Sequence, residues 1–229
     1  MLLLISSLLL MSCGADKYMK KGEKFLALGE YYDAADQFKQ AYTRTPVKER
    51  DTRGKRALKM AQCYQRINAT PKAIAAYRNA IRYNQASKED QLAYARQLLK
   101  NGDYRQAEKV FLMLKDSMPG NQLIANGLKS AQMAPEWKKQ GSRYIVKRMD
   151  VFNSRRHDYS PVLFGDDYDQ LYFTSTRNEA LGDELSGITG TKAGDIFLSE
   201  KDDRGKWSKP EAIGTGLNTD YDEGACCFT

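Results

Sequence analysis

The chain has 229 residues, with 36 Lys and Arg against 29 Asp and Glu, one histidine and four cysteines. This composition is that of a folded protein with a well-solvated surface, and one histidine with scattered cysteines excludes an ordinary structural zinc site. The charge is divided unevenly, because residues 14–150 hold 28 basic and 14 acidic side chains, whereas residues 151–229 hold 8 and 15.

The first element is an apolar stretch, Leu2–Leu10, which Ser12 and Cys13 follow closely. About ten apolar residues are too few to span a bilayer as a helix, but they suit the central region of an export signal. The run Leu10-Met11-Ser12-Cys13 resembles the lipobox of bacterial lipoproteins. The resemblance implies that residues 1–12 are a signal peptide, that lipid is attached to Cys13, and that residues 13–19 form a tether. The alternative is a buried apolar helix with an incidental cysteine.

Export changes how the basic half of the chain is interpreted. A basic domain in the cytoplasm would suggest nucleic acid, but an exported one does not meet it, so we expect no nucleic-acid partner. An acidic partner surface, anionic lipid head groups near the tether and a solvated helical face remain open. No second apolar segment is long enough to cross a membrane, so lipid on Cys13 would be the membrane attachment.

Residues 20–133 contain three segments that can be aligned on one another. Each has a glycine or asparagine, an alanine five residues later and an aromatic residue four further on, and the anchor alanines are 39 and 34 residues apart. The shared positions are Gly29, Ala34, Phe38 and Ala41, then Asn68, Ala73, Tyr77 and Ala80, then Gly102, Ala107 and Phe111. This pattern resembles the tetratricopeptide repeat, whose period is 34 residues. The resemblance implies an all-α solenoid of three helix pairs, with a capping helix at about residues 121–133.

Tetratricopeptide arrays bind proteins, usually in a concave groove lined by the first helix of each pair. The candidates for partner binding in this groove or at its rim are Lys24, Arg56, Lys59, Arg66 and Arg96. The alternative for each is plain solvated surface. We expect Cys63 to be a buried apolar residue beside Tyr64.

Beyond a linker at residues 134–150, which contains Pro135, the pattern changes to short alternating runs. Residues 160–164, 171–175 and 195–199 each predict a strand, and residues 207–214 predict a fourth. Residues 221–228 echo residues 159–164 about 62 positions later. These phrases resemble the WD40-like propeller repeats of the TolB kind. Residues 151–229 would then be an incomplete all-β propeller, about one blade plus the first strand of the next, and the chain would be the N-terminal part of a longer protein.

The candidate catalytic and ligand motifs fail on their spacing. His157 has no nucleophile elbow with it, the glycine-rich run at residues 182–192 lacks the phosphate-loop spacing, and residues 166–169 lack the glycine and distal glutamate of a calcium loop. We therefore expect no enzyme activity, no metal and no cofactor.

The order of lipobox, short tetratricopeptide array and propeller resembles the envelope lipoproteins of the Bacteroidetes type IX (Por) secretion system, which usually end in an OmpA-like peptidoglycan-binding domain. The resemblance implies a multidomain, non-enzymatic scaffold that is lipid-anchored in the outer membrane and faces the periplasm. Its partners would be envelope proteins, in particular an outer-membrane secretion component, and peptidoglycan only through a C-terminal domain outside these residues. The alternative is a ligand-binding or sensory lipoprotein whose propeller recognises glycan or a small molecule.

Overall fold

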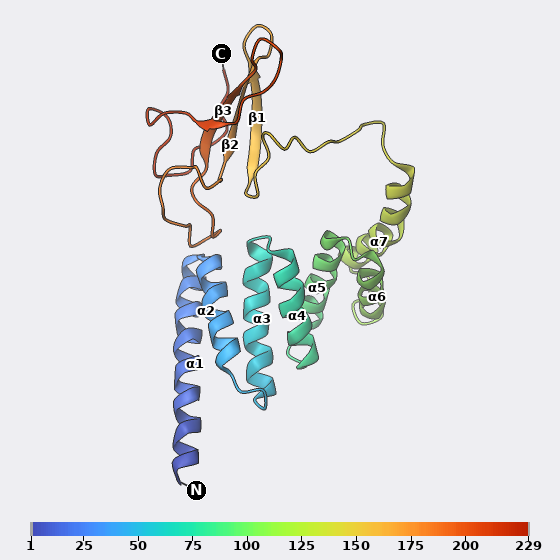
Figure 1. Cartoon of the computed structure of the whole chain (residues 1–229). Helices are drawn as coiled ribbons and strands as arrows, with labels where there is room; N and C mark the ends of the chain where they lie inside the picture. Colours follow the sequence, from blue (N-terminus) through green and yellow to red (C-terminus); the bar gives the residue numbers. More distant parts are fainter. Residues whose placement is uncertain (1, 229) are drawn as a thin grey trace. The chain divides into compact units, whose positions relative to one another are not determined.

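The computed structural model describes residues 2–228, and it describes side chains from Gly14 to Phe228 (Figure 1). Cys13, and with it the lipobox prediction, lies outside the described side chains. The chain forms two compact units, Met1–Arg143 and Tyr144–Thr229. Within the described residues, every helix is too short or too polar to cross a membrane.

The first unit consists of helices that pack in chain order, each against the next (Figure 1). The last helix, α7, packs against α6 and also touches α5. The helices are α1 (Leu2–Leu28), α2 (Tyr31–Arg44), α3 (Arg50–Arg66), α4 (Thr70–Arg82), α5 (Lys88–Asn101), α6 (Tyr104–Lys115) and α7 (Gln122–Gln140). This is the stack of helix pairs with a capping helix that the repeats predict.

The turn inside each helix pair has the same geometry three times. Gly29, Asn68 and Gly102 all have positive φ, at 80°, 57° and 84°, a conformation that glycine adopts freely and asparagine tolerates. The amide after each turn residue donates to a carbonyl five residues back, from Glu30 to Phe25, from Ala69 to Tyr64 and from Asp103 to Leu98, each over 2.9 Å. The repeats are therefore the same local structure as well as the same sequence pattern.

The core of this unit is made by the predicted anchors. The alanines Ala34, Ala73 and Ala107 are fully buried, and so are the aromatic residues Phe38, Tyr77 and Phe111 beside them. Cys63 is buried too, at 1% exposure. Glycine makes room for two of the rings: a Cβ on Gly22 would lie 2.6 Å from the ring of Phe38, and one on Gly127 would overlap the ring of Phe111. The small residues thus set how closely the helices approach.

Two boundaries of the array differ from the prediction. The tether was predicted at residues 13–19, but residues 14–19 belong to α1, where Ala15 is buried and Met19 packs on the core. Pro135 was expected to lie in a linker, but it lies inside α7, which runs on to Gln140. The residues after Pro135 favour helix strongly enough to continue it for another turn, and Gly141, with φ 69°, ends it.

The second unit is one antiparallel sheet whose strands lie in chain order, β1-β2-β3-β4. The strands are β1 (Asp158–Phe164), β2 (Gln170–Ser175), β3 (Asp195–Glu200) and β4 (Glu211–Ala212). The first three match the predicted strands to within two residues at each end. The fourth is shorter than predicted, because Pro210 has no amide hydrogen to donate and Trp207 joins only an isolated bridge to Lys201.

The expected first strand of a second blade is not formed, since residues 221–228 are in no strand. They fold back on the same sheet. Gly194 donates to the carboxylate of Asp222 over 2.7 Å, and the ring of Phe228 stacks on Phe164 with centroids 4.3 Å apart. A strand needs a neighbouring strand for its backbone groups, and residues 221–228 pair with none of the described strands.

Candidate functional site

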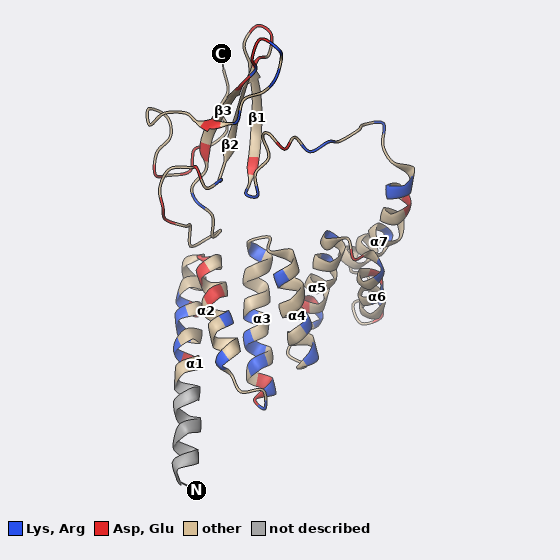
Figure 2. Ribbon diagram, in the orientation of Figure 1, with Lys and Arg blue, Asp and Glu red and all other residues tan. Residues whose placement is uncertain are grey.

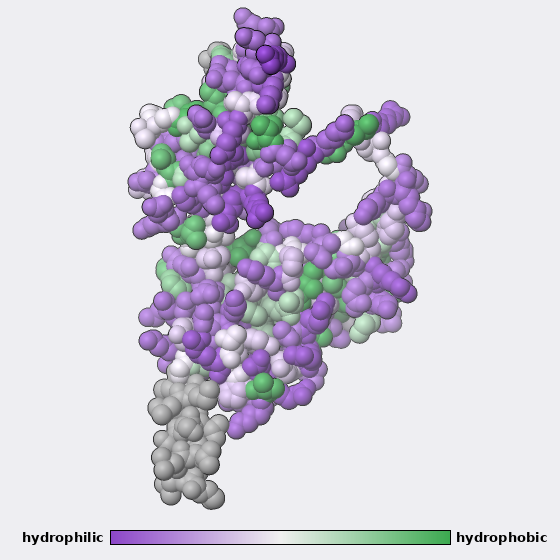
Figure 3. All heavy atoms as spheres, in the orientation of Figure 1, coloured by the Kyte–Doolittle hydropathy of each residue, from purple (hydrophilic) through white to green (hydrophobic). Residues whose placement is uncertain are grey.

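A hollow of about 400 Å³ lies among the first helices of the three repeats. Helices α1, α3 and α5 supply most of its lining, and α2 and α4 add one tyrosine each. The lining residues are Leu26, Tyr31, Gln62, Gln65, Arg66, Tyr77, Glu89, Asp90 and Ala93. Its lining comes mainly from the first helices, as predicted for a groove of the array. Figure 3 shows one face of the helical unit, which is mostly hydrophilic with scattered apolar patches.

Hydrogen bonds between helices fix several side chains of the hollow. The Tyr77 hydroxyl donates to Oε1 of Gln65 over 2.6 Å, and burial raises the pKa of Tyr77 to about 12, so it stays a donor. The amide of Gln62 donates to Oδ1 of Asp90 over 3.1 Å, which joins α3 to α5. Asp90 is also held by its own helix, where it forms a capping box with Ser87. These bonds hold Gln65, Gln62 and Asp90 in defined positions within the array.

Arg66 and Glu89 are the charged groups of the hollow left open to solvent. Arg66 is exposed, and its guanidinium lies over the ring of Tyr31 at 5.7 Å from the centroid. Within residues 14–228 its side chain forms no hydrogen bond or ion pair, and the exposed carboxylate of Glu89 forms none either. The hollow therefore offers a cation and an anion on adjacent repeats, and two glutamine amides and an apolar leucine also line it.

The five predicted partner-binding residues do not lie together. Arg66 lines the hollow, whereas Lys24 lies on α1 in a separate row of lysines. Lys59 is half-buried on α3, and Arg96 is exposed on α5. Neither of these two lines the hollow.

Arg56 holds three helices together and has little surface for a partner. It is 6% exposed, and its guanidinium bonds to Asp16 of α1, to the hydroxyl of Thr45 after α2 and, over 3.3 Å, to the carbonyl of Ala41. Burial of this kind argues for a structural role, because a buried guanidinium is tolerated when its donors are satisfied. Of these two arginines, Arg66 is therefore the candidate for contact with a partner in the groove.

Most of the hollow's uncharged lining escaped the sequence analysis. Gln62, Gln65 and Ala93 carry no charge and form no motif, so no chemical signal singles them out. One positional signal exists: Leu26 and Gln65 each come one residue after an aromatic residue, Phe25 and Tyr64, of a first helix. Extending the repeat alignment across these helices would have found part of the set.

The second unit contains a buried ion pair beside its apolar core. Arg177 donates to the carboxylate of Asp158 over 2.8 Å, both side chains being less than 10% exposed, and Ser175 donates to the same carboxylate over 2.7 Å. Burial raises the pKa of Asp158, but these hydrogen bonds outweigh it and hold the pKa below the ordinary value. His157 is exposed beside this pair, and its backbone amide bonds to Thr176.

A second carboxyl group of this unit, that of Asp195, is fully buried. Asp195 accepts a hydrogen bond from the amide of Leu181 over 2.7 Å, but its other oxygen has no partner. Burial and the neighbouring Glu223 raise the pKa of Asp195. Among the described residues, no three His, Cys, Asp or Glu side chains gather as they would around a metal ion.

Comparison with known proteins gives a structural likeness for the helical unit only. No protein-family model matches the chain, and no curated protein matches it in sequence. The first tetratricopeptide domain of Spaghetti (RPAP3), solved with the HSP90 peptide SRMEEVD, is 18% identical with a TM-score of 0.44, covering 55% of this chain and 95% of that one. The C-terminal tetratricopeptide-containing domain of a Plasmodium falciparum FK506-binding protein is 15% identical with a TM-score of 0.47, covering 57% and 94%.

The Sgt2 tetratricopeptide domain of Aspergillus fumigatus is 18% identical with a TM-score of 0.43, covering 59% of this chain and 88% of that one. All three are similar to this chain in the arrangement of their helices. The evidence for helix pairs in this chain is its own repeats, with three matching turns and three sets of buried anchors.

Proposed function

We propose that the chain is a non-enzymatic scaffold whose helical array holds an extended segment of a partner protein against α1, α3 and α5. The observation that carries the proposal is the convergence of polar groups from successive repeats on one hollow, with Arg66 and Glu89 left unpaired. A segment with an acidic group near Arg66 and a basic group near Glu89 satisfies both charges and lies in one direction only. Leu26 and Ala93 also line the hollow and offer apolar contact to other side chains of the bound segment.

A photo-crosslinking experiment in the native host tests this assignment. A benzoylphenylalanine at Gln62 lies in the hollow, and one at Arg78 lies on the exposed side of α4, away from it. We expect a defined adduct from position 62 that Arg66→Glu abolishes, and none from position 78. The same adducts from both positions, or an adduct at 62 that is indifferent to Arg66→Glu, would refute the groove as the binding surface.

We also propose that the scaffold is an envelope lipoprotein attached by lipid at Cys13, facing the periplasm from the outer membrane. The support is the sequence from Leu2 to Cys13 and its resemblance to a lipobox. Metabolic labelling with an alkyne fatty acid checks it: the label should enter the wild-type chain and the Cys63→Ala variant, but not Cys13→Ala. Label retained in Cys13→Ala would contradict it.

The finer placement as a type IX (Por) secretion component rests on the resemblance along the chain. It treats the second unit as one blade of a TolB-like propeller, which the meander of β1 to β4 suits in size and order. The crosslinked partner is the discriminating result, because an outer-membrane secretion component supports this placement and a protein of another system contradicts it.

A further inference from the structure

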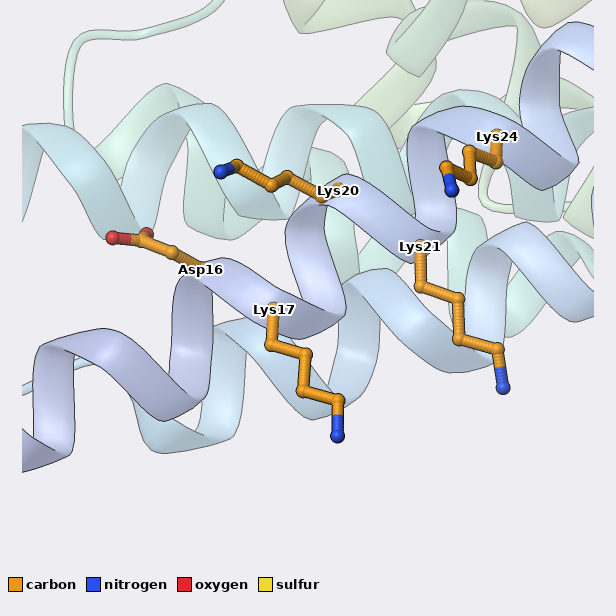
Figure 4. Close-up of a pocket in the computed structure, with 5 residues that line it drawn as sticks. All are labelled: Asp16, Lys17, Lys20, Lys21 and Lys24. Atoms are coloured by element: carbon orange, nitrogen blue, oxygen red, sulfur yellow. The ribbon is translucent and has the colours of Figure 1, made fainter.

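Four lysines form one stripe along the exposed side of α1. They are Lys17, Lys20, Lys21 and Lys24, at spacings of three, four and seven residues. At 3.6 residues per turn, these positions fall within about 100° of the helix circumference and extend over about 10 Å of its length. Figure 2 shows the lysines of α1 in blue, and Figure 4 shows Lys17 and Lys21 pointing to the same side.

The stripe lies opposite the face of α1 that packs on the array. Ala15, Gly22 and Leu26 belong to that packed face, and α2 is the neighbour they meet. All four lysines are exposed or line the open side of α1, and within residues 14–228 none of them forms an ion pair. Their charge is therefore neither neutralised inside the unit nor covered by another helix of it.

The acidic residues near the stripe do not cancel it. Asp16 is already paired with Arg56, and Glu23 lies at the edge of the stripe, about 60° from Lys20 around the helix. Leu28 continues the same line at the C-terminal end of α1 and is 72% exposed. The stripe therefore presents charged side chains along α1 and one exposed apolar side chain at its C-terminal end.

We propose that this lysine stripe of α1 lies on the surface of an anionic phospholipid bilayer. A row of ammonium groups on flexible stems suits a plane of diffuse negative charge, since it has no fixed fork of donors to select one shape of ligand. Leu28 adds an apolar side chain to the contact. The stripe then orients the array, with α1 against the membrane and the concave hollow available to partners.

The position of the stripe in the sequence favours a bilayer over an acidic protein. Lys17 comes seven residues after Leu10 and four after Cys13. Seven residues span at most about 25 Å in any conformation. Either the apolar stretch or a lipid on Cys13 would therefore hold the stripe near the membrane, and the proposal holds with either attachment.

Vesicle flotation with the whole chain tests the proposal, using Cys13→Ala throughout so that no acyl chain contributes. The vesicles are pure phosphatidylcholine or phosphatidylcholine partly replaced by phosphatidylglycerol. The test variant is K17Q/K20Q/K21Q/K24Q. The control is K109Q/K115Q/K129Q/K138Q, which removes the same charge from exposed lysines of α6 and α7.

We expect the parent chain to prefer the anionic vesicles, and the stripe variant to lose about a hundredfold in partition coefficient to them, whereas the control loses less than about fivefold. The preference should fade as salt shortens the screening length from about 10 Å at 0.1 M to about 3 Å at 1 M. Equal losses of vesicle binding in the two variants would overturn the proposal, because net charge and not the stripe would then determine binding. Equal binding of the parent chain to neutral and anionic vesicles would overturn the proposal. If the stripe then bound an acidic protein, that protein and not the bilayer would be its partner.

Discussion

Replacing Arg56 by methionine is the sharpest test of how the N-terminal end of the array is held. Arg56 joins α3 to Asp16 of α1 and to Thr45 at the end of α2. Methionine keeps much of the buried alkyl volume, so the change removes the polar contacts and little of the packing.

The size of the effect follows from what each partner loses. The Asp16 side chain is 57% exposed, so water replaces the guanidinium there at little cost. The hydroxyl of Thr45 keeps its 2.7 Å bond to the carbonyl of Ala41, so neither group is stranded. The remaining loss is a charge-assisted hydrogen bond in a buried place, and we expect the free energy of unfolding of the helical unit to fall by about 2 kcal/mol.

Thermal unfolding followed by circular dichroism should show Arg56→Met melting about 4–8 °C below the parent. Hydrogen exchange should rise first in α1 and α2, because each repeat is stabilised by its neighbours. Lys55→Met, an exposed lysine on the same helix, is the matched control and should change little. If Arg56→Met and Lys55→Met unfold within 0.5 kcal/mol of each other, roughly the range of surface changes, the bridging role given to Arg56 is refuted.

Three further predictions concern the two cores. Gly127→Ala should destabilise the helical unit by about 1–2 kcal/mol, because the added methyl group overpacks against the buried ring of Phe111 even after the gain in helix propensity. Gly14→Ala, with open space around it, should not destabilise the unit. Equal melting temperatures for the two variants would contradict the close approach of Gly127 to Phe111. Burial raises the pKa of Cys63 to about 11, so iodoacetamide should modify it far more slowly than the exposed Cys227 in a mass-spectrometric time course, and similar rates would contradict this. The pKa of Asp158 is lower in the folded than in the unfolded chain, so its carboxylate should stabilise the second unit at pH values above the unfolded-state pKa, and this stabilisation should be lost as the pH falls through the folded-state pKa. In urea unfolding, the Asp158→Asn variant should be less stable than the parent at neutral pH, and its stability should depend less on acid. An unchanged dependence on acid would contradict the pairing of Asp158 with Arg177.

The repeat anchors were predictable from the sequence because each imposes a size. Ala73 must be small for its helices to approach, Tyr77 must fill the gap beside it, and Asn68 must tolerate positive φ at the turn. These demands act on single positions at fixed spacing, so they are visible without knowing the partners. The strands at 171–175 and 195–199 were predictable because each is a short run rich in apolar and β-favouring residues; both are buried along most of their length.

The contacts that the sequence did not reveal depend on residues far apart in the chain. Arg56 reads as a surface residue until Asp16, 40 residues away, is known to face it. Arg177 reads the same way until Asp158 is placed under it. Residues 221–228 were wrongly predicted to form a strand, because a strand-like sequence forms a strand only where it pairs with a neighbouring strand.

The packing of α1 along the length of α2 also determines how the array bears mechanical load. Ala15 and Gly22 lie a helical turn or more apart on the packed face, so contact extends along the axis of α1. A tension along that axis would shear the whole interface at once, whereas a pull across it would peel one contact after another. Shear distributes the force over every contact, so α1 should resist detachment better under a load along its axis than under the same load across it.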